Sequence, residues 1–215
     1  MGKELLTIGT RLEVYEETKD DNKRVWVSQL ELKGEDFLYI SMPISKGYTV
    51  PLKPGSIVKI VFFKEKNTYS FKAEIIENIW GKIPKIKIAL KSPLKKIQRR
   101  KYYRLDAFIP TKFYLEKQEN KKHTGVVENI SGGGMLLAAS LDLKIGDIIK
   151  FRLNLKDYGV LDLKGKVVRK NKNEKSLKYN YLYGIYFMDI NEKNRDIIIK
   201  YIFEEQRKLR NRGLI

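Results

Sequence analysis

The absence of cysteine from a chain of 215 residues excludes disulfide frameworks, thiolate zinc sites and cysteine nucleophiles, and the length allows one or two domains with cores of their own. The 44 basic residues outnumber the 26 acidic ones, giving a net charge of +18, and a single histidine further restricts metal chemistry. The charge is uneven, because residues 1–90 carry 15 basic and 12 acidic side chains whereas residues 91–215 carry 29 and 14. We therefore expect the second half of the chain to bind an anionic partner.

No segment of the sequence is typical of membrane insertion or export. The longest apolar runs, such as 57–63, are interrupted by lysine, and no run of 18 apolar residues is available for a transmembrane helix. The first residues turn polar too early for a signal peptide. These patterns predict a soluble cytoplasmic protein without a membrane span.

Residues 1–90 show the two-residue alternation of short antiparallel strands. In the segment 69–75, for example, the apolar residues Tyr69, Phe71 and Ala73 alternate with polar ones. A polar run at 19–23 predicts a hairpin turn, and prolines and a glycine between 43 and 55 predict a loop. We place strands at 11–15, 25–27, 36–40, 57–63, 69–75 and 85–90. They predict a small barrel or sandwich that carries no chemical site.

The second half repeats the β pattern and ends with a helical one. Strands are expected at 105–115, 125–130, 134–138, 148–155, 161–169 and 181–187. Beyond them, Asp189 or Asn191 can cap a helix, and Glu192 stands three residues after Asp189, as in a capping box. The apolar stripe of that helix includes Ile198 and Ile202, which favours a packing role over a nucleic-acid-binding one.

The predicted fold class is therefore all-β, with two small antiparallel β-barrels joined by a basic linker and followed by a C-terminal α-helix. We place the N-terminal barrel at 1–90, the linker at 91–98 and the second barrel with its helix at 99–215.

The segment 91–104 is the densest basic stretch, with seven basic residues and no acidic one. Three of them, Arg99, Arg100 and Arg104, are arginines, whose planar donor forks bind phosphate oxygens or the guanine edge in bidentate fashion. In an extended chain Arg100 and Arg104 lie on one face, since they are an even number of residues apart, and Arg99 points the opposite way. The spacing predicts that the guanidinium groups of Arg100 and Arg104 bind two groups of the same ligand.

A second feature is the run Asn129-Ile-Ser131-Gly-Gly-Gly134. Such a turn lets backbone N–H groups approach a ligand, with Asn129 and Ser131 supplying side-chain donors and acceptors. The alternative is a glycine hairpin in which Asn and Ser bond only to local backbone groups. The glycine spacing fits neither a Walker loop nor a Rossmann fingerprint.

Together, Arg99-Arg100-x-x-x-Arg104 and Asn129-x-Ser131-x-x-Gly134 resemble the paired signature of the PilZ family, usually written RRxxxR and D/N-x-S-x-x-G. The run 183–187 is similar to a late strand of that domain, and residues 1–90 are similar to the barrel that precedes it in flagellar brake proteins of the YcgR type.

The resemblance implies a receptor for cyclic di-GMP, a bacterial second messenger, rather than an enzyme. It implies that Arg100 and Arg104 contact phosphates and guanine edges, that Arg99 assists from the linker, and that no cofactor or metal is required. Asn129 and Ser131 would contact a guanine and Gly134 would keep the turn compact. Arg169 is a further candidate for phosphate contact or stacking.

From the placement of the arginines we expect a mobile linker in the free protein, because like charges repel, and a fixed interdomain angle after a diphosphate ligand binds. In brake proteins the altered surface engages the flagellar motor. By resemblance we therefore expect control of motility through a motor component, with recruitment to the motor base.

Two other classes compete with this interpretation. A nucleic-acid-binding β-barrel would also use a basic patch and exposed tyrosines, but it does not account for the arginine spacing or for the Asn-x-Ser turn. An enzyme would need a catalytic constellation, whereas His123 stands in a stretch predicted to be a solvated loop, without a partner serine or metal-ligand spacing. We also expect Tyr102 and Tyr103 to be core or barrel-surface aromatics rather than platforms for bases.

Overall fold

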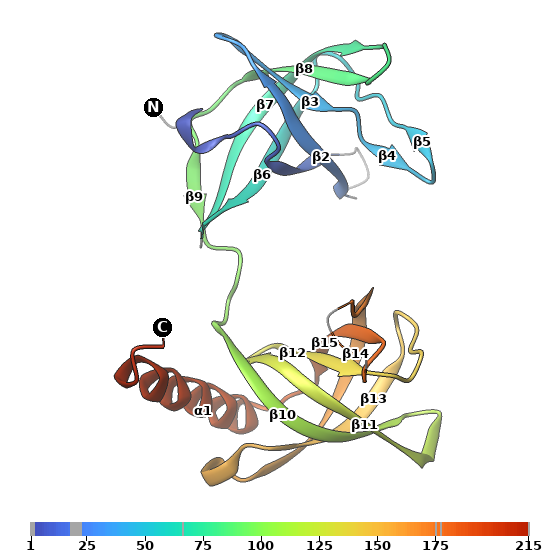
Figure 1. Cartoon of the computed structure of the whole chain (residues 1–215), viewed down its shortest axis with the longest axis vertical. Helices are drawn as coiled ribbons and strands as arrows, with labels where there is room; N and C mark the ends of the chain where they lie inside the picture. Colours follow the sequence, from blue (N-terminus) through green and yellow to red (C-terminus); the bar gives the residue numbers. More distant parts are fainter. Residues whose placement is uncertain (1–2, 18–22, 66, 175, 177, 215) are drawn as a thin grey trace. The chain divides into compact units, whose positions relative to one another are not determined.

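The computed structural model describes residues 3–17, 23–65, 67–174, 176 and 178–214. The chain divides into two compact units, residues 1–99 and 100–215 (Figure 1). Residues 19–22 of the predicted turn lie outside the described residues, and Lys23 begins a strand. Among the described residues, no helix has the length and apolar character needed to cross a bilayer.

In the described part of the first unit, six strands close into an antiparallel barrel in the order β6-β1-β2-β3-β8-β7, with β7 returning to β6. The barrel strands are β1 (Arg11–Glu17), β2 (Lys23–Lys33), β3 (Phe37–Ser41), β6 (Ile57–Lys64), β7 (Asn67–Ile79) and β8 (Lys85–Leu90). A 3₁₀ turn, η1 (Lys3–Leu5), precedes them, and a short ribbon of β4 (Ile44–Ser45) and β5 (Tyr48–Thr49) lies in the predicted loop.

The predicted alternation of side chains produces the core of this barrel. Phe71, Ala73 and Ile75 of β7 are buried, and Lys72 between them is exposed. They join the inward side chains of the other strands, including Leu38 and Ile40 of β3, in one apolar cluster. Burial of one face in every strand is what closes the sheet on itself.

The structure differs from the linker predicted at 91–98. Within that segment, β9 (Lys95–Ile97) pairs with residues Thr68 to Ser70 of β7, a stretch that β8 does not reach. The Lys91 N–H also donates to the Lys72 carbonyl over 2.8 Å, and the Lys72 N–H donates to Ser92 Oγ over 2.8 Å. Backbone groups of β7 that β8 leaves unpaired thus bind the segment to the first unit. Composition alone does not show which backbone groups need a partner, so the sequence did not predict this strand.

The second unit is a closed six-stranded antiparallel barrel in the order β10-β11-β12-β15-β14-β13. Its strands are β10 (Arg104–Leu115), β11 (Gln118–Ser131), β12 (Gly134–Ala139), β13 (Ile148–Asn154), β14 (Val160–Lys172) and β15 (Tyr181–Met188), with a 3₁₀ turn, η2 (Lys156–Tyr158), between β13 and β14. The helix α1 (Glu192–Asn211) follows. The predicted all-β class, two barrels and C-terminal helix are confirmed.

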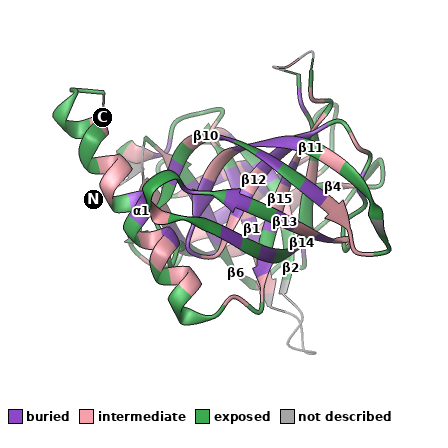
Figure 2. Cartoon of the chain, turned by 90° about the horizontal axis from the view of Figure 1, so that it is seen from below, coloured by how far each residue is buried: buried purple, intermediate pink, exposed green. Residues whose placement is uncertain are grey.

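The helix α1 packs one face on the second barrel. Ile198, Tyr201 and Ile202 are buried in the same apolar cluster as the barrel interior. In Figure 2 buried residues follow the barrel strands, whereas α1 shows exposed and intermediate residues along much of its length. Such a distribution is expected for a helix that buries a single stripe.

The structure chooses between the two predicted caps of α1. Asn191 is the N-cap, because its extended backbone lets Oδ1 accept the Asn194 N–H over 2.8 Å. Asp189 lies outside the helix in the left-handed region at φ 47°, so the capping box predicted with Glu192 is wrong.

Candidate ligand-binding site

Strand pairing in the second barrel brings the start of β10, the end of β11 and the start of β12 together. Arg104 lies opposite Ser131, Ser131 lies opposite Gly134, and Gly134 in turn lies opposite Tyr186 of β15. Asn129 lies nearby on β11, opposite Asp106 of β10. Antiparallel register therefore places the two sequence motifs side by side.

Arg104 is the centre of a cluster of guanidinium groups. Partial burial lowers its pKa, and the positive charges of Arg100 and Arg169 lower it further. All three side chains are exposed, and none forms an ion pair with a described residue. Three uncompensated like charges make this surface suited to an anion with more than one negative group.

Arg169 reaches this cluster from β14, at a register shift between β14 and β15. It lies opposite Gly184, and a Cβ added to that glycine would come within 3.2 Å of Arg169 Cβ. Gly184 thus leaves room for the arginine side chain. The sequence motif at 183–187 contained this glycine, but its part in positioning Arg169 was not foreseen.

Gly134 cannot carry a side chain in the turn between β11 and β12. A Cβ at this position would stand 2.2 Å from the carbonyl oxygen of Ile185, which belongs to a backbone that cannot retreat without breaking the sheet. A glycine is therefore needed at the point where β12 packs on β15.

Ser131 and Asn129 differ in how their side chains are used. The Ser131 hydroxyl is buried and donates to the Gly134 carbonyl over 3.0 Å, as in the hairpin alternative considered from the sequence. The Asn129 side chain forms no hydrogen bond with any described residue. Its amide is therefore the group of the turn that is free to recognise a ligand.

Tyr102 holds the chain that leads into β10. Its ring lies against the glycine turn, since a Cβ on Gly132 would meet Tyr102 Cδ1 at 2.8 Å. Its hydroxyl accepts a hydrogen bond from Arg195 Nη1 over 2.6 Å, and the Arg195 guanidinium lies 5.4 Å from the ring centroid. The prediction of a core or surface aromatic missed this positioning role, because Arg195 is 93 residues away in the chain.

Arg99 is held within the first unit. Its Nη1 donates to Glu13 Oε2 over 2.7 Å and its Nη2 donates to the Tyr15 hydroxyl over 2.8 Å. Burial acts to raise the pKa of the Glu13 carboxyl, but hydrogen bonds from Tyr15 and Arg99 and the charge of Arg99 outweigh it and lower that pKa. Of the three arginines in the first motif, Arg99 alone already has an anionic partner within the described chain.

The described residues contain no group of three His, Cys, Asp or Glu side chains placed to hold a metal ion. His123, predicted in a solvated loop, lies instead in β11, where its ring centroid is 5.5 Å from that of Phe113. Burial, together with the charge of Lys121, lowers the pKa of this imidazole. The polar residues around His123 had suggested a loop, but they form part of the long β10–β11 hairpin.

The fold and this cluster define a two-barrel β protein with a polycationic surface at the entry to the second barrel. The chain belongs to the PilZ domain family, which residues 98–204 match, and residues 7–90 match the family described as flagellar protein YcgR. No curated protein matches the chain significantly by sequence.

Two solved structures are similar over most of their length. The Bacillus subtilis inhibitor of motility MotI/DgrA is 20% identical, with a TM-score of 0.80, and the match covers 94% of this chain and 99% of that one. YcgR from Escherichia coli in complex with c-di-GMP is 15% identical, with a TM-score of 0.56, over 98% of this chain and 90% of that one. At these identities the likeness establishes the fold.

Proposed function

We propose that the protein is a cyclic di-GMP receptor that binds the dinucleotide at the start of the second barrel. The observation that carries this proposal is the guanidinium cluster of Arg100, Arg104 and Arg169 beside the 131–134 turn, in the part of the chain that matches the PilZ domain. The similar YcgR structure contains c-di-GMP, which supports the choice of ligand.

The chemistry of the cluster suits a compact diphosphate that carries guanines. Arg100 and Arg104 offer forks for phosphate oxygens and for the O6 and N7 edge of guanine, and Arg169 adds a phosphate contact or a stacking plane. Asn129 offers both an amide donor and an amide acceptor to a guanine. The three arginines repel one another in the free protein. A dianionic ligand neutralises this repulsion, which favours binding.

Arg99 contributes less in this proposal, since it must exchange a carboxylate and a tyrosine hydroxyl for the ligand. Ser131 also contributes less, because its hydroxyl proton is already donated to Gly134 within the turn. Gly134 acts by shape alone.

We further propose that the ligand changes the interdomain orientation and that the altered surface acts on motility through a protein partner, a component of the flagellar motor. The match of residues 7–90 to the flagellar protein YcgR family supports this output, as does the likeness to the Bacillus subtilis inhibitor of motility. The protein would act in the cytoplasm and be recruited to the motor base.

Calorimetric titration of the full chain with cyclic di-GMP tests the binding. Arg104→Ala should weaken binding by about 10- to 100-fold, the range for losing hydrogen bonds to a charged group. The same substitution should not lower the unfolding midpoint, because it removes repulsion from Arg100 and Arg169. Ser131→Ala and Arg99→Ala should cost less affinity.

Undiminished binding by Arg104→Ala would show that the site lies elsewhere. Tight, strongly salt-dependent binding of single-stranded DNA without any response to the dinucleotide would favour a nucleic-acid-binding barrel instead.

Chromatography of the incubated ligand tests the proposed absence of catalysis, because an enzyme would release linear product. Loss of a motility effect in cells that carry Arg104→Ala would tie the output to the ligand.

A further inference from the structure

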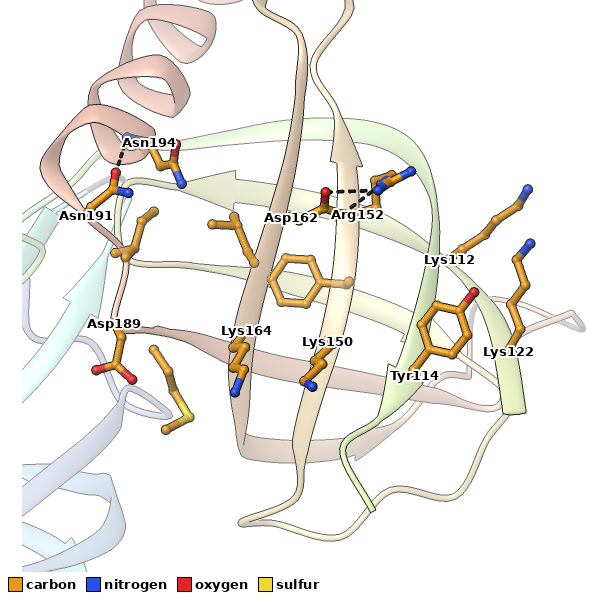
Figure 3. A pocket seen from close by; sticks show the side chains of 14 residues that line it. Lys112, Tyr114, Lys122, Lys150, Arg152, Asp162, Lys164, Asp189, Asn191 and Asn194 are labelled. Atoms are coloured by element: carbon orange, nitrogen blue, oxygen red, sulfur yellow. Dashed lines mark hydrogen bonds and ion pairs between the residues drawn. The ribbon is translucent and has the colours of Figure 1, made fainter. Parts of the chain in front are cut away.

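A second cationic surface lies on the second barrel, around a hollow of about 750 Å³. Its basic side chains are Lys112, Lys122, Lys150, Arg152 and Lys164, which are here called the basic face. Figure 3 shows Lys112, Lys122 and Tyr114 together on one side and Lys150 beside Lys164. No sequence motif pointed to these residues, because they come from four strands.

Strand register explains how these residues gather. Lys112 of β10 lies opposite Arg152 of β13, and Lys150 of β13 lies opposite Lys164 of β14. Lys122 of β11 lies opposite Tyr114 of β10. Since neighbouring strands are about 4.8 Å apart, the five cations occupy a small area of adjoining strands.

The positive charge of the basic face is only partly compensated. Arg152 donates two hydrogen bonds to Asp162, over 2.7 and 2.9 Å, and Lys164 pairs with Glu116 at 3.1 Å. Lys112 and Lys122 are exposed and form no ion pair with a described residue. The described chain thus leaves two lysines of the face without an anionic partner.

The basic face is distinct from the candidate ligand-binding site. Lys112 follows Arg104 by eight residues along β10, about 25 Å of extended strand. None of the residues in the two sequence motifs lines the hollow. A ligand at Arg104 therefore leaves the basic face accessible.

We propose that the basic face is a docking surface for an acidic segment of a partner protein, one that carries an apolar side chain among its carboxylates. Tyr114, Met188 and Ile190 also line the hollow, and aromatic residues and methionine are among those that protein interfaces favour. The charge of the lysines would select the partner and speed its approach.

A nucleic acid fits this surface less well. The single guanidinium fork of the face is already bound by Asp162, so no free arginine is available for bidentate contact with phosphate. Asp162 and Asp189 also line the hollow, so a strand with a charge on every unit must meet them, whereas a segment of mixed acidic and apolar residues can place its carboxylates at Lys112 and Lys122 alone. Lysine ammonium groups bind phosphates and carboxylates alike, and the apolar side chains of the lining are what favour a protein segment.

The test compares two double variants of the full chain that change the charge equally. Lys112→Glu with Lys122→Glu alters the face, and Lys172→Glu with Lys200→Glu alters exposed lysines that do not line it. The probe is a short fluorescent peptide that repeats Glu-Leu-Glu, followed by anisotropy at about 150 mM salt. Labelled oligothymidylate and vesicles that contain phosphatidylglycerol are measured in parallel.

We expect the face variant to bind the peptide about tenfold more weakly, and the control variant at most about twofold more weakly, since only the former loses local charge pairing. An equal loss in both variants, no measurable binding of the peptide by the parent, or a larger loss for oligothymidylate or vesicles than for the peptide would overturn the proposal.

This proposal rests on the proposed function in one respect, namely that a protein partner reads the ligand-bound state. Cyclic di-GMP titration of the same variants separates the two, because the face variant should bind the dinucleotide like the parent and keep its unfolding midpoint. If no form of the protein binds the dinucleotide, the proposed function fails, and the peptide comparison still decides the role of the basic face.

Discussion

At the scale of single residues, the steric demand at Gly134 is the most sharply defined feature of the site. An alanine there would place its Cβ 2.2 Å from the Ile185 carbonyl oxygen, and the sheet must move to relieve the contact. Gly133, next to it in the same turn, has its nearest contact at 3.4 Å, an ordinary distance. The two neighbouring glycines therefore form a matched pair.

Gly134→Ala should destabilise the second barrel by about 1–3 kcal/mol, the usual cost of overpacking, and weaken dinucleotide binding. Gly133→Ala should leave the free energy of unfolding nearly unchanged. Urea unfolding of both variants measures the difference. Equal stability of the two would contradict a close packing of β12 on β15.

The ion pair of Arg99 with Glu13 predicts a pH dependence of stability. The folded-state pKa of Glu13 is lowered, so its contribution is present above the unfolded-state value near 4.5 and is lost as the pH falls through the folded-state value. Both side chains are more than a third exposed, at 39% and 43%, so solvent screening limits the pair to about 0.5 kcal/mol.

The unfolding midpoint of the parent should therefore decline more steeply with acidification below about pH 5 than that of Glu13→Gln. Thermal melts of both proteins over this range measure the effect. Glu4→Gln serves as a control, because Glu4 is an exposed carboxylate without an ion pair to a described residue. Parallel profiles for parent and Glu13→Gln would show that the pair contributes nothing measurable.

At the scale of elements, Tyr102 connects three parts of the second unit. Its ring packs on the 132–133 turn and its hydroxyl accepts from Arg195 of α1, while it precedes β10 by only two residues. The chain that carries Arg100 and Arg104 is thus oriented by the helix and by the turn together. The helix α1 thus influences the candidate site through the hydrogen bond from Arg195 to Tyr102.

Tyr102→Phe should weaken cyclic di-GMP binding by about threefold to tenfold, the range for losing one hydrogen bond, with little change in the unfolding midpoint. Arg195→Gln should have a similar effect, and the double variant should cost no more than either alone. Tyr103→Phe is the control, since Tyr103 is 51% exposed and has no hydrogen bond to a described residue. Additive effects would show that the two residues act separately.

At the scale of the whole molecule, each unit contains a closed barrel with its own apolar cluster. The fragment 100–215 should therefore fold alone and unfold cooperatively, as judged by circular dichroism. It should still bind the dinucleotide, about as well as Arg99→Ala in the full chain, because both lack the same arginine. A fragment without cooperative unfolding would mean that the second barrel depends on the first.

Much of the fold follows from the sequence, because a two-residue alternation of apolar side chains reports directly on one buried face. The strands at 57–63 and 148–155 are close to those observed, β6 (Ile57–Lys64) and β13 (Ile148–Asn154). Errors occurred where backbone pairing outweighs composition. Strand β9 forms from two lysines and an isoleucine, and β11 runs through a polar stretch that includes His123, since each supplies hydrogen bonds that a neighbouring strand lacks.

The sequence by itself determined the all-β class, the two barrels and the two motifs at 99–104 and 129–134, since alternation, turn residues and spacing are local properties. Only the tertiary structure decided which side chains meet. Antiparallel register sets Arg104 beside Ser131, a shift in β14 brings Arg169 to the same cluster, and the pairing of four strands assembles the basic face. Such contacts join residues far apart in the chain, and their distances depend on how the barrel closes.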